Sequence, residues 1–304
     1  GSNFARATPD SPLIAKALKN QKLTVNIATK LNHSHLLPGK VSYVLPCLGR
    51  TEIDRNADGV AQIVTVEDSM SMVHGSGGIN KPASRELRSE IGIIAGIAEA
   101  TVGSAVVDWK GLAHHYDRIR DLIARTIPGF QNYNERVRRP RGFRLPNGAA
   151  ERIWHTPSQK ATFGRVELPD QTEHQRAVAE KGTFVLQTFR SHDQYNTTVY
   201  GLDDRYRGVY GERRVVFVNP ADLAEIGAEA GERVDIIGRY DDGVERIAES
   251  FRVVPYELPR GSVAGYYPEL NVLVPLSSAG ELSDTPTSKS VLVSFRLSEQ
   301  AKAA

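Results

Sequence analysis

Hydrophobic and polar positions in the first third of the chain alternate between the spacing of strands and that of helices. Short apolar runs predict strands at residues 23–27, 41–45 and 62–66. Asp10 and Pro12 offer a helix cap and a first-turn proline ahead of an apolar helical face within residues 13–18. Strands interleaved with helices predict an α/β layer with parallel strands.

Two further helices are predicted from the same kind of spacing. Ser84 is expected to cap a helix with the apolar face Leu87, Ile91, Ile94 and Ala98. A second helix, with Leu112, Tyr116, Ile119 and Ile123 on one face, is expected to end before Pro128. The chain opens at a strand-to-helix turn without its preceding strand. We therefore expect residues 1–128 to be a partial α/β domain from a larger subunit.

Residues 129–182 change character, because arginines cluster among prolines and glycines and no apolar period is sustained. We interpret this stretch as a connecting segment. From residue 183 the pattern becomes mainly β, with the clearest strand carrying Val291, Val293, Phe295 and Leu297 on one side. Asn219 and Pro220 start a short helix that Gly227 closes. Many short strands with one brief helix predict a small closed β-barrel over residues 183–304.

Composition narrows the function classes without choosing one. The 304 residues carry 38 basic and 36 acidic side chains, a net charge of +2 that argues against a nucleic acid or a membrane surface as partner. The chain has one cysteine, so it cannot supply the ligand set of an iron–sulfur cluster. We see no secretory signal and no apolar run long enough to span a membrane, and we expect a cytoplasmic location.

Cysteine, histidine and glycine motifs give little chemistry by themselves. Cys47 follows a strand without a visible base, and we interpret it as a buried structural thiol. The adjacent pair His114 and His115 lacks a third ligand at motif spacing, so we interpret it as surface or packing residues on a helix. His33 and His35 lie in a loop after a strand, where a ligand contact is open but not favoured. The glycine-rich stretch at His74 lacks the lysine of a P-loop and is interpreted as a turn.

The most informative stretch is residues 188–198, which follows a predicted strand and is almost wholly made of side chains that hydrogen-bond or stack. Arg190 can pair with a phosphate, and Gln194 and Asn196 can read donors and acceptors on a ring. Such a loop suits a large polar ligand with phosphates, although a polar hairpin connection has the same composition.

Several motifs, in order along the chain, resemble those of the molybdopterin oxidoreductases. Residues 188–197 resemble the segment with which this family holds a molybdopterin guanine dinucleotide. Residues 218–234, 266–273 and 283–289 resemble its later strand–helix–strand signature, its loop with a cofactor-binding asparagine and its closing motif with a lysine. Upstream, residues 1–4 resemble the turn that begins its nucleotide-binding half. Residues 45–54 and 66–74 resemble the branch of formate-dehydrogenase-like alpha subunits.

The resemblance implies a partial Rossmann-like α/β domain followed by a double-psi-like β-barrel. It also implies dinucleotide contacts from Thr188, Phe189, Arg190, Ser191, His192, Asp193, Gln194, Tyr195, Asn196, Thr197, Asn271 and Lys289. Asn3 and Thr29, at α/β turn positions, are expected to reach a second dinucleotide.

For the parent enzyme the family implies a molybdenum bis(molybdopterin guanine dinucleotide) cofactor and two-electron redox chemistry on a small-molecule substrate. The metal ligand and any 4Fe-4S cluster are expected in an N-terminal part that precedes this chain, so these residues alone are expected to be inactive. The alternative is a non-catalytic binding or assembly module that keeps the barrel. A nucleotide-binding hydrolase is disfavoured, because the sequence shows no nucleophile–base pair or metal set.

Overall fold

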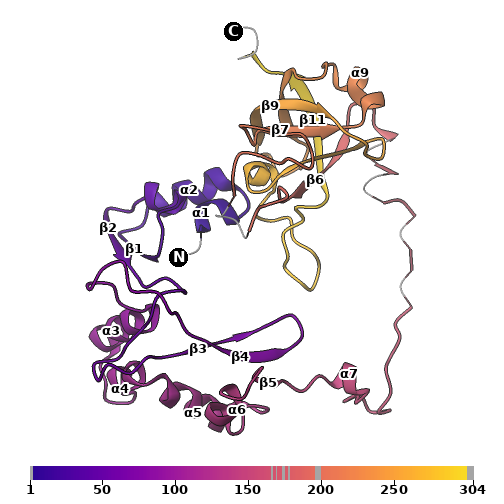
Figure 1. Cartoon of the computed structure of the whole chain (residues 1–304). Helices are drawn as coiled ribbons and strands as arrows, with labels where there is room; N and C mark the ends of the chain where they lie inside the picture. Colours follow the sequence, from indigo (N-terminus) through magenta and orange to yellow (C-terminus); the bar gives the residue numbers. More distant parts are fainter. Residues whose placement is uncertain are drawn as a thin grey trace. The chain divides into compact units, whose positions relative to one another are not determined.

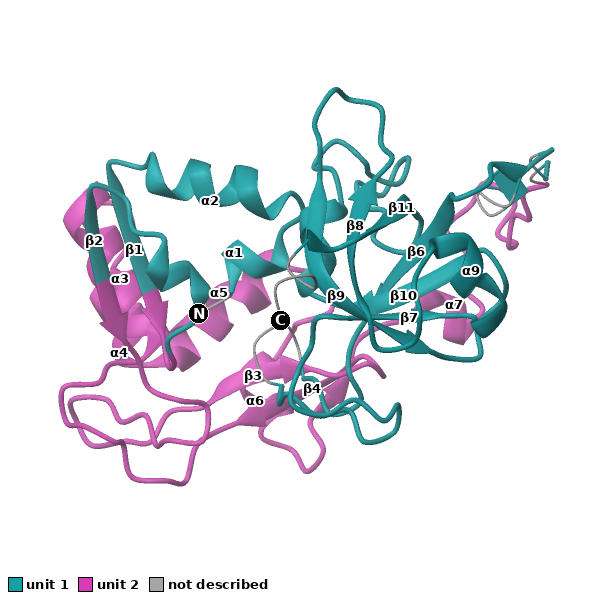
Figure 2. Cartoon of the chain, turned by 90° about the horizontal axis from the view of Figure 1, so that it is seen from above, with its two compact units in different colours: residues 1–26, 31–43, 167–304 teal, residues 27–30, 44–166 magenta. Residues whose placement is uncertain are grey.

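The computed structural model describes residues 3–165, 167–168, 170–172, 175–176, 179–195 and 200–299. The chain divides into two compact units, shown in different colours in Figure 2. Unit 1 comprises residues 1–26, 31–43 and 167–304, and unit 2 comprises residues 27–30 and 44–166. Each unit is described separately below.

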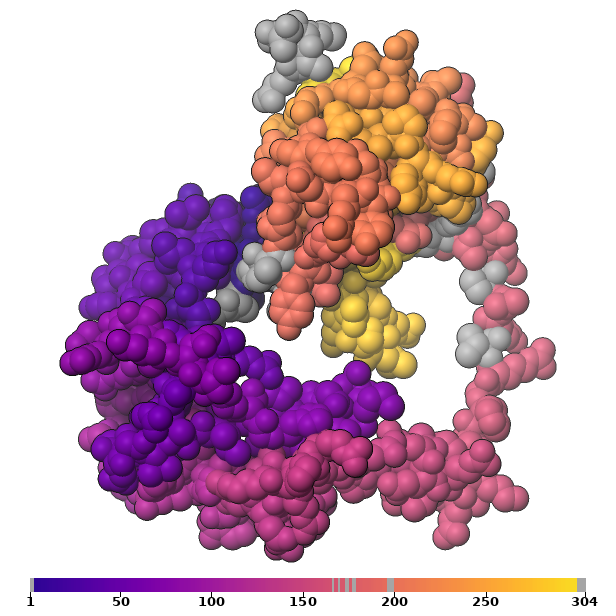
Figure 3. Space-filling view, viewed as in Figure 1, coloured from indigo at the N-terminus to yellow at the C-terminus, as the bar shows by residue number. Residues whose placement is uncertain are grey.

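A closed six-stranded β-barrel, in the order β10-β6-β11-β8-β9-β7, forms the centre of unit 1. Its strands are β6 (Phe184–Phe189), β7 (Val215–Val218), β8 (Arg233–Gly238), β9 (Ile247–Pro255), β10 (Ser262–Tyr266) and β11 (Val291–Leu297). β6 pairs with β10 and β7 with β9 in parallel, and the other neighbours are antiparallel. These strands gather into one compact body (Figures 1 and 3). The closed barrel expected from the sequence is confirmed.

Apolar side chains from every barrel strand meet in one core, which includes Leu186, Val216, Ile236, Val253, Val263 and Val293. β7 is buried along its whole length, which explains its unbroken apolar run. Asp235 in β8 is charged but buried. Its carboxylate accepts from the backbone N–H of Ser250 at 3.0 Å and from Arg296 at 3.2 Å. The bulge between β8 and β9 lies at this position.

Short helices complete unit 1. They are α1 (Phe4–Ala7), α2 (Ser11–Lys19), α9 (Leu223–Ile226) and the 3-10 helices η1 (His33–Leu36), η2 (Pro220–Asp222) and η3 (Glu269–Leu273). Asn219 caps η2 and Gly227 ends α9 in the left-handed conformation, as the sequence predicts. The expected cap of α2 is wrong, because Asp10 makes no capping bond. Its carboxylate instead pairs with Arg246 at 2.9 Å in a buried ion pair.

The strands of the first half of the chain form two small sheets. β1 (Leu23–Ala28) and β2 (Val41–Pro46) make a two-stranded sheet, and β3 (Val64–Glu67), β4 (Met72–Ser76) and β5 (Phe143–Arg144) make a three-stranded one. The positions of β1, β2 and β3 follow the predicted apolar runs. β3 and β4 form an antiparallel pair, so the parallel layer expected here is wrong for β3. The glycine-rich stretch begins inside β4.

The helices of unit 2 are α3 (Glu90–Val102), α4 (Trp109–His114), α5 (Tyr116–Thr126), α6 (Tyr133–Val137) and α7 (Gly148–Glu151). Two predicted features are wrong. Ser89, not Ser84, caps α3, because its hydroxyl accepts from the backbone N–H of Gly92 at 3.1 Å. The helix expected through Leu112 and Ile123 is broken at His115, whose backbone is extended.

The arginine-rich stretch after residue 129 is partly folded into unit 2. Tyr133, Val137 and Phe143 are buried together with Val73 in a small core. Arg136 lies over the ring of Phe143, 3.8 Å from its centroid. Arg138 pairs with Asp117 at 2.7 Å and Arg139 with Glu135 at 2.5 Å. These three arginines therefore contact other residues of unit 2. Every helix in the described residues is too short or too polar to cross a lipid bilayer.

Candidate functional site

The polar loop singled out in the sequence begins where β6 leaves the barrel. Thr188 is buried in β6, and its backbone carbonyl accepts a hydrogen bond from the ammonium group of Lys289. The ring of Phe189 packs against those of Phe217 and Tyr266, with centroids 5.5 and 5.3 Å away. The strand therefore anchors the loop, and Lys289 reaches its first turn from a segment 101 residues later.

Arg190 and Lys289 place two positive charges beside this anchor. Arg190 is exposed, and in the part of the chain that the structure describes it makes no hydrogen bond or ion pair. Burial, and then the charge of Arg190, lower the pKa of Lys289. Burial raises the pKa of Tyr267, whereas a hydrogen bond from Asn271 and the charge of Arg190 act against that rise. The charge of Arg190 thus acts on both Lys289 and Tyr267, and Asn271 contacts Tyr267.

Two predicted residues are used to hold the loop itself. Ser191 and Gln194 are buried, and the side-chain oxygen of Gln194 accepts from the backbone N–H of Ser191 at 3.1 Å. Arg213 donates to the Ser191 hydroxyl at 2.7 Å and to Gln194 at 2.9 Å. Arg213 also forms a buried ion pair with Glu269 at 2.9 Å. These bonds fix the loop against η3, so Ser191 and Gln194 shape the site from within.

The next part of the loop is fixed by Asp204, which the sequence did not single out. Its carboxylate accepts from the backbone N–H of His192 at 3.2 Å, from Arg207 at 2.6 Å and from the Tyr266 hydroxyl at 3.0 Å. Burial works to raise the pKa of Asp204, but the bonds from Arg207 and Tyr266 outweigh it and the pKa is lowered.

The remaining predicted loop residues differ in exposure. The ring of His192 lies against that of Tyr206, with centroids 3.6 Å apart. Asp193 and Tyr195 are exposed. Asn196 and Thr197 lie outside the described residues.

Asn271, predicted from the family's asparagine loop, is almost wholly buried in η3. Its amide nitrogen donates to the backbone carbonyls of Arg6 at 2.6 Å and Thr8 at 3.5 Å. Its carbonyl oxygen is buried without a hydrogen-bond partner among the described residues. Asn3 has the same property at the start of α1, with a buried side-chain oxygen that no described group satisfies. Unpaired buried amide oxygens are costly, and a ligand that donates hydrogen bonds would remove that cost.

Two histidines of η1 add further unpaired polar atoms beside α1. The hydroxyl of Ser34, between them, accepts from the backbone N–H of Ala5 at 3.0 Å, which joins η1 to α1. Nδ1 of His33 and Nε2 of His35 are buried and have no partner within the described residues. Burial, and then the charge of Arg6, lower the pKa of His33. From the sequence, a ligand contact by His33 or His35 was open but not favoured. The burial of these ring nitrogens could not be read from the sequence.

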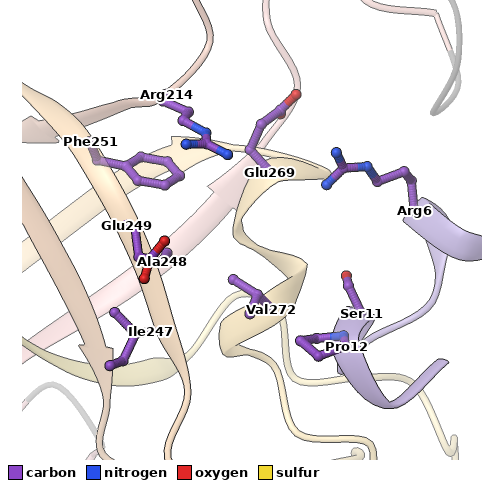
Figure 4. Close-up of a pocket in the computed structure, with 10 residues that line it drawn as sticks. All are labelled: Arg6, Ser11, Pro12, Arg214, Ile247, Ala248, Glu249, Phe251, Glu269 and Val272. Carbon is purple, nitrogen blue, oxygen red and sulfur yellow. The ribbon is translucent and has the colours of Figure 1, made fainter. Parts of the chain in front are cut away.

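A cavity of about 290 Å³ opens in unit 1 between α1, the start of α2 and the barrel. Arg6 and Arg214 extend into it from opposite sides toward Glu269, and Ser11 lies at its α2 edge (Figure 4). Since Glu269 also pairs with Arg213, this cavity adjoins the network that holds the loop. Thr29, expected to reach a second dinucleotide, belongs to unit 2 and is exposed directly after β1.

Cys47, the only cysteine, is buried as predicted and forms no disulfide. Burial, and then the charge of Glu90, raise the pKa of its thiol. A raised pKa disfavours the nucleophilic thiolate, so the arrangement around Cys47 favours a structural role.

Comparison with known proteins gives an independent view of these residues. The molydopterin dinucleotide binding domain family matches residues 184–292, which contain the barrel from β6 into β11. An uncharacterized oxidoreductase of Mycobacterium tuberculosis (strain ATCC 25618 / H37Rv) is 49% identical over 299 residues, 96% of this chain and 38% of that protein. Protein YdeP of Escherichia coli (strain K12) is 47% identical over the same coverage of 96% and 38%. The chain therefore spans 38% of the length of these relatives.

A solved structure supports the fold. Acetylene hydratase from Pelobacter acetylenicus superimposes with a TM-score of 0.62 at 15% identity, covering 97% of this chain and 43% of that one. At this low identity the likeness concerns the fold alone.

Proposed function

We infer from the match of residues 184–292 to the molydopterin dinucleotide binding domain family and from the oxidoreductase relatives that this chain belongs to the molybdopterin oxidoreductases. On that premise we propose that its barrel holds one molybdopterin guanine dinucleotide. The observation that carries the proposal is the grouping of Lys289, Arg190 and Asn271 around the end of β6 and η3. Two cations and an unpaired buried amide oxygen are the groups that a pyrophosphate and a hydrogen-bond-donating ring require.

The residues present fit this cofactor. Arg190 and Lys289 would neutralise the charge of the pyrophosphate, because Arg190 has no acidic partner among the described residues and Lys289 touches only a carbonyl there. The unpaired oxygen of Asn271 would accept a hydrogen bond from the ligand. Ser191, Gln194 and Asp204 would hold the loop that carries Arg190 and His192. Asn3, with its own unpaired oxygen, and Thr29 are proposed to contact a second dinucleotide.

For the parent enzyme we propose two-electron redox chemistry of the formate-dehydrogenase-like type on a small molecule, in the cytoplasm. The bound molybdenum bis(molybdopterin guanine dinucleotide), with a 4Fe-4S cluster elsewhere in the enzyme, would supply the redox chemistry. This chain would orient the pterin and exclude water around the pyrophosphate. The oxidoreductase names of the relatives support the reaction class. The two parallel pairs, β6 with β10 and β7 with β9, support a double-psi barrel, and the helix–strand alternation before residue 128 supports a partial Rossmann-like domain.

The proposal is tested by titrating the full chain with dinucleotide cofactor released from a molybdoenzyme and following pterin fluorescence. Loss of one charge-assisted contact, worth about 1.5–3 kcal/mol, would weaken binding by about tenfold to 150-fold in Lys289→Ala and in Arg190→Ala. Arg239→Ala is the matched control, because Arg239 is a half-exposed barrel arginine paired with Glu180. Equal affinity in all three variants and the unchanged chain contradicts the site.

A further inference from the structure

Two adjacent histidines of unit 2 lie beside a carboxylate from a distant turn. His114 ends α4, His115 follows it, and Asp58 lies in a turn 56 residues before His114. Nε2 of His114 is 2.8 Å from the Asp58 carboxylate, and Nε2 of His115 is 3.7 Å from the same oxygen. The ligand atoms of the three residues lie within 4.8 Å of one another. The fold thus supplies the third ligand that the sequence lacked.

We propose that Asp58, His114 and His115 bind one divalent transition-metal ion of the Zn²⁺, Co²⁺ or Ni²⁺ type, with water completing its coordination. Two imidazole nitrogens and one carboxylate oxygen are the donors that such ions prefer, whereas Mg²⁺ and Ca²⁺ prefer oxygen ligands throughout. Ligand atoms around a tetrahedral zinc ion, at bond lengths of about 2.0–2.1 Å, lie about 3.3 Å apart. The present separations of 2.8 and 3.7 Å bracket that value, so small side-chain shifts suffice.

Both sides of the cluster are held by hydrogen bonds that do not involve the ligand atoms. The side-chain oxygen of Asn56 accepts from the backbone N–H groups of Asp58 at 3.1 Å and Val60 at 2.9 Å, which fixes the turn. The amide of Gln62 donates to the carbonyl of Ala113 at 3.2 Å and accepts from the N–H of Tyr116 at 2.9 Å. Gln62 therefore spans the histidine pair and fixes the backbone break between α4 and α5. A site held on both sides loses little conformational freedom when an ion binds.

Asn56 also sets the proton position on His115. Its amide nitrogen is 3.2 Å from Nδ1 of His115. The oxygen of this amide accepts hydrogen bonds from the turn, so the group that faces His115 is the amide nitrogen, which donates to Nδ1. The ring proton of His115 therefore lies on Nε2 in the metal-free protein. An ion at Nε2 requires that proton to move to Nδ1, where it needs an acceptor. Asn56→Asp would provide the acceptor and create a carboxylate–histidine–metal arrangement, which strengthens such sites.

Water has access to the cluster. The side chain of Asp58 is 61% exposed, and those of His114 and His115 are 34% and 38% exposed. His114 also lines a cavity of about 710 Å³ within unit 2. Open positions of the ion would therefore be filled by water. The competing explanation is a set of ordinary surface ion pairs, and unit 2 offers one for comparison. His74 and Asp68 lie 2.8 Å apart with similar exposure, and neither belongs to a three-ligand group among the described residues.

The experiment titrates the full chain, first dialysed against a chelator, with Co²⁺ followed by visible absorption and with Zn²⁺ followed by calorimetry. One equivalent is expected to bind saturably, and Asp58→Asn, His114→Gln and His115→Gln are each expected to weaken binding by about tenfold to 100-fold. His74→Gln is the matched control and should leave the affinity unchanged, while Asn56→Asp should increase it. Circular dichroism of each variant verifies folding.

Two results overturn the proposal. One is the absence of saturable binding to the unchanged chain. The other is an affinity that is equal in His114→Gln, His115→Gln, Asp58→Asn and His74→Gln. Because every variant lies in unit 2, neither result bears on the dinucleotide site in the barrel.

Discussion

The side-chain amide of Asn271 donates to the backbone carbonyl of Arg6 at 2.6 Å, across 265 residues of sequence. This bond joins η3 of the barrel region to α1 and leaves the other end of the Asn271 amide, its oxygen, buried and unpaired among the described residues. One residue thus positions a second segment and keeps an acceptor for a ligand. Asn271 therefore has two separable roles.

Those roles can be separated by substitution. In Asn271→Ala the carbonyl of Arg6 loses its partner in a buried place, so the free energy of unfolding should fall by about 1–3 kcal/mol. Asn271→Asp is expected to lose the same bond but to keep an acceptor oxygen, so its cofactor affinity should fall less than that of Asn271→Ala. Urea unfolding followed by circular dichroism measures the first effect, and pterin fluorescence the second. Equal cofactor affinity in both variants would argue against a ligand-facing oxygen.

The buried pair of Asp10 and Arg246 is expected to be the strongest ion-pair contribution in unit 1. Both side chains are more than nine-tenths buried. Removal of Arg246 leaves the Asp10 charge uncompensated, whereas removal of Asp10 leaves Arg246 paired with Asp242 at 2.9 Å. Arg246→Ala should lower the free energy of unfolding by about 3–5 kcal/mol, and the double variant with Asp10→Ala by less than the sum of the single variants.

A double-mutant cycle in urea, followed by circular dichroism, measures this coupling. The chain's two tryptophans, Trp109 and Trp154, both lie in unit 2, so their fluorescence reports the other unit. The exposed pair of Arg239 and Glu180 is the control, expected to contribute at most about 1 kcal/mol. If the losses of unfolding free energy in Asp10→Ala and Arg246→Ala simply add in the double variant, the predicted coupling is contradicted.

Asp204 should make the stability of the barrel depend on pH. Its pKa is lowered in the folded state, so its contribution is present above its unfolded pKa of about 3.9 and is lost as pH falls through the folded value. Asp204→Asn is expected to be less stable than the unchanged chain at pH 7, with the difference shrinking in acid below about pH 4. Urea midpoints between neutral and acidic pH test this, and a difference that stays constant to the lowest pH contradicts it.

Cys47 should be inert in the folded chain. Its side chain is buried and its thiol pKa is raised, so a thiol reagent at neutral pH should react only after unfolding. The reaction rate with a disulfide reagent, measured with and without urea, checks this. Rapid reaction of the folded chain would show that the thiol is accessible.

The barrel was predictable because burial imposes a strong pattern on short strands. The wholly apolar run of β7 and the alternation in β11 are visible in the sequence for this reason. The burial of Asp235 was not predictable, because its hydrogen bonds to Ser250 and Arg296 come from distant strands that no local pattern reveals. The break at His115 was also hidden, since the apolar spacing continues in phase from α4 into α5.

For the dinucleotide site, the sequence motifs identified residues but not the contacts that these residues make. Lys289 and Asn271 were found through the resemblance, and their contacts with Thr188 and Arg6 depend on the closed barrel. Arg213 was missed, because it lies outside every motif and acts through Ser191 and Gln194, 22 and 19 residues away. Sequence composition alone did not distinguish loop residues that hold the loop from those that face outward.

The central claim is that the barrel grips the pyrophosphate of a dinucleotide through Arg190 and Lys289. It is tested most directly by comparing the affinity of the chain for the guanine dinucleotide form of molybdopterin with that for molybdopterin without the nucleotide. The account predicts that the dinucleotide binds more tightly, and that the double variant Arg190→Ala, Lys289→Ala loses most of that preference. Equal affinity of the unchanged chain for both forms would contradict it.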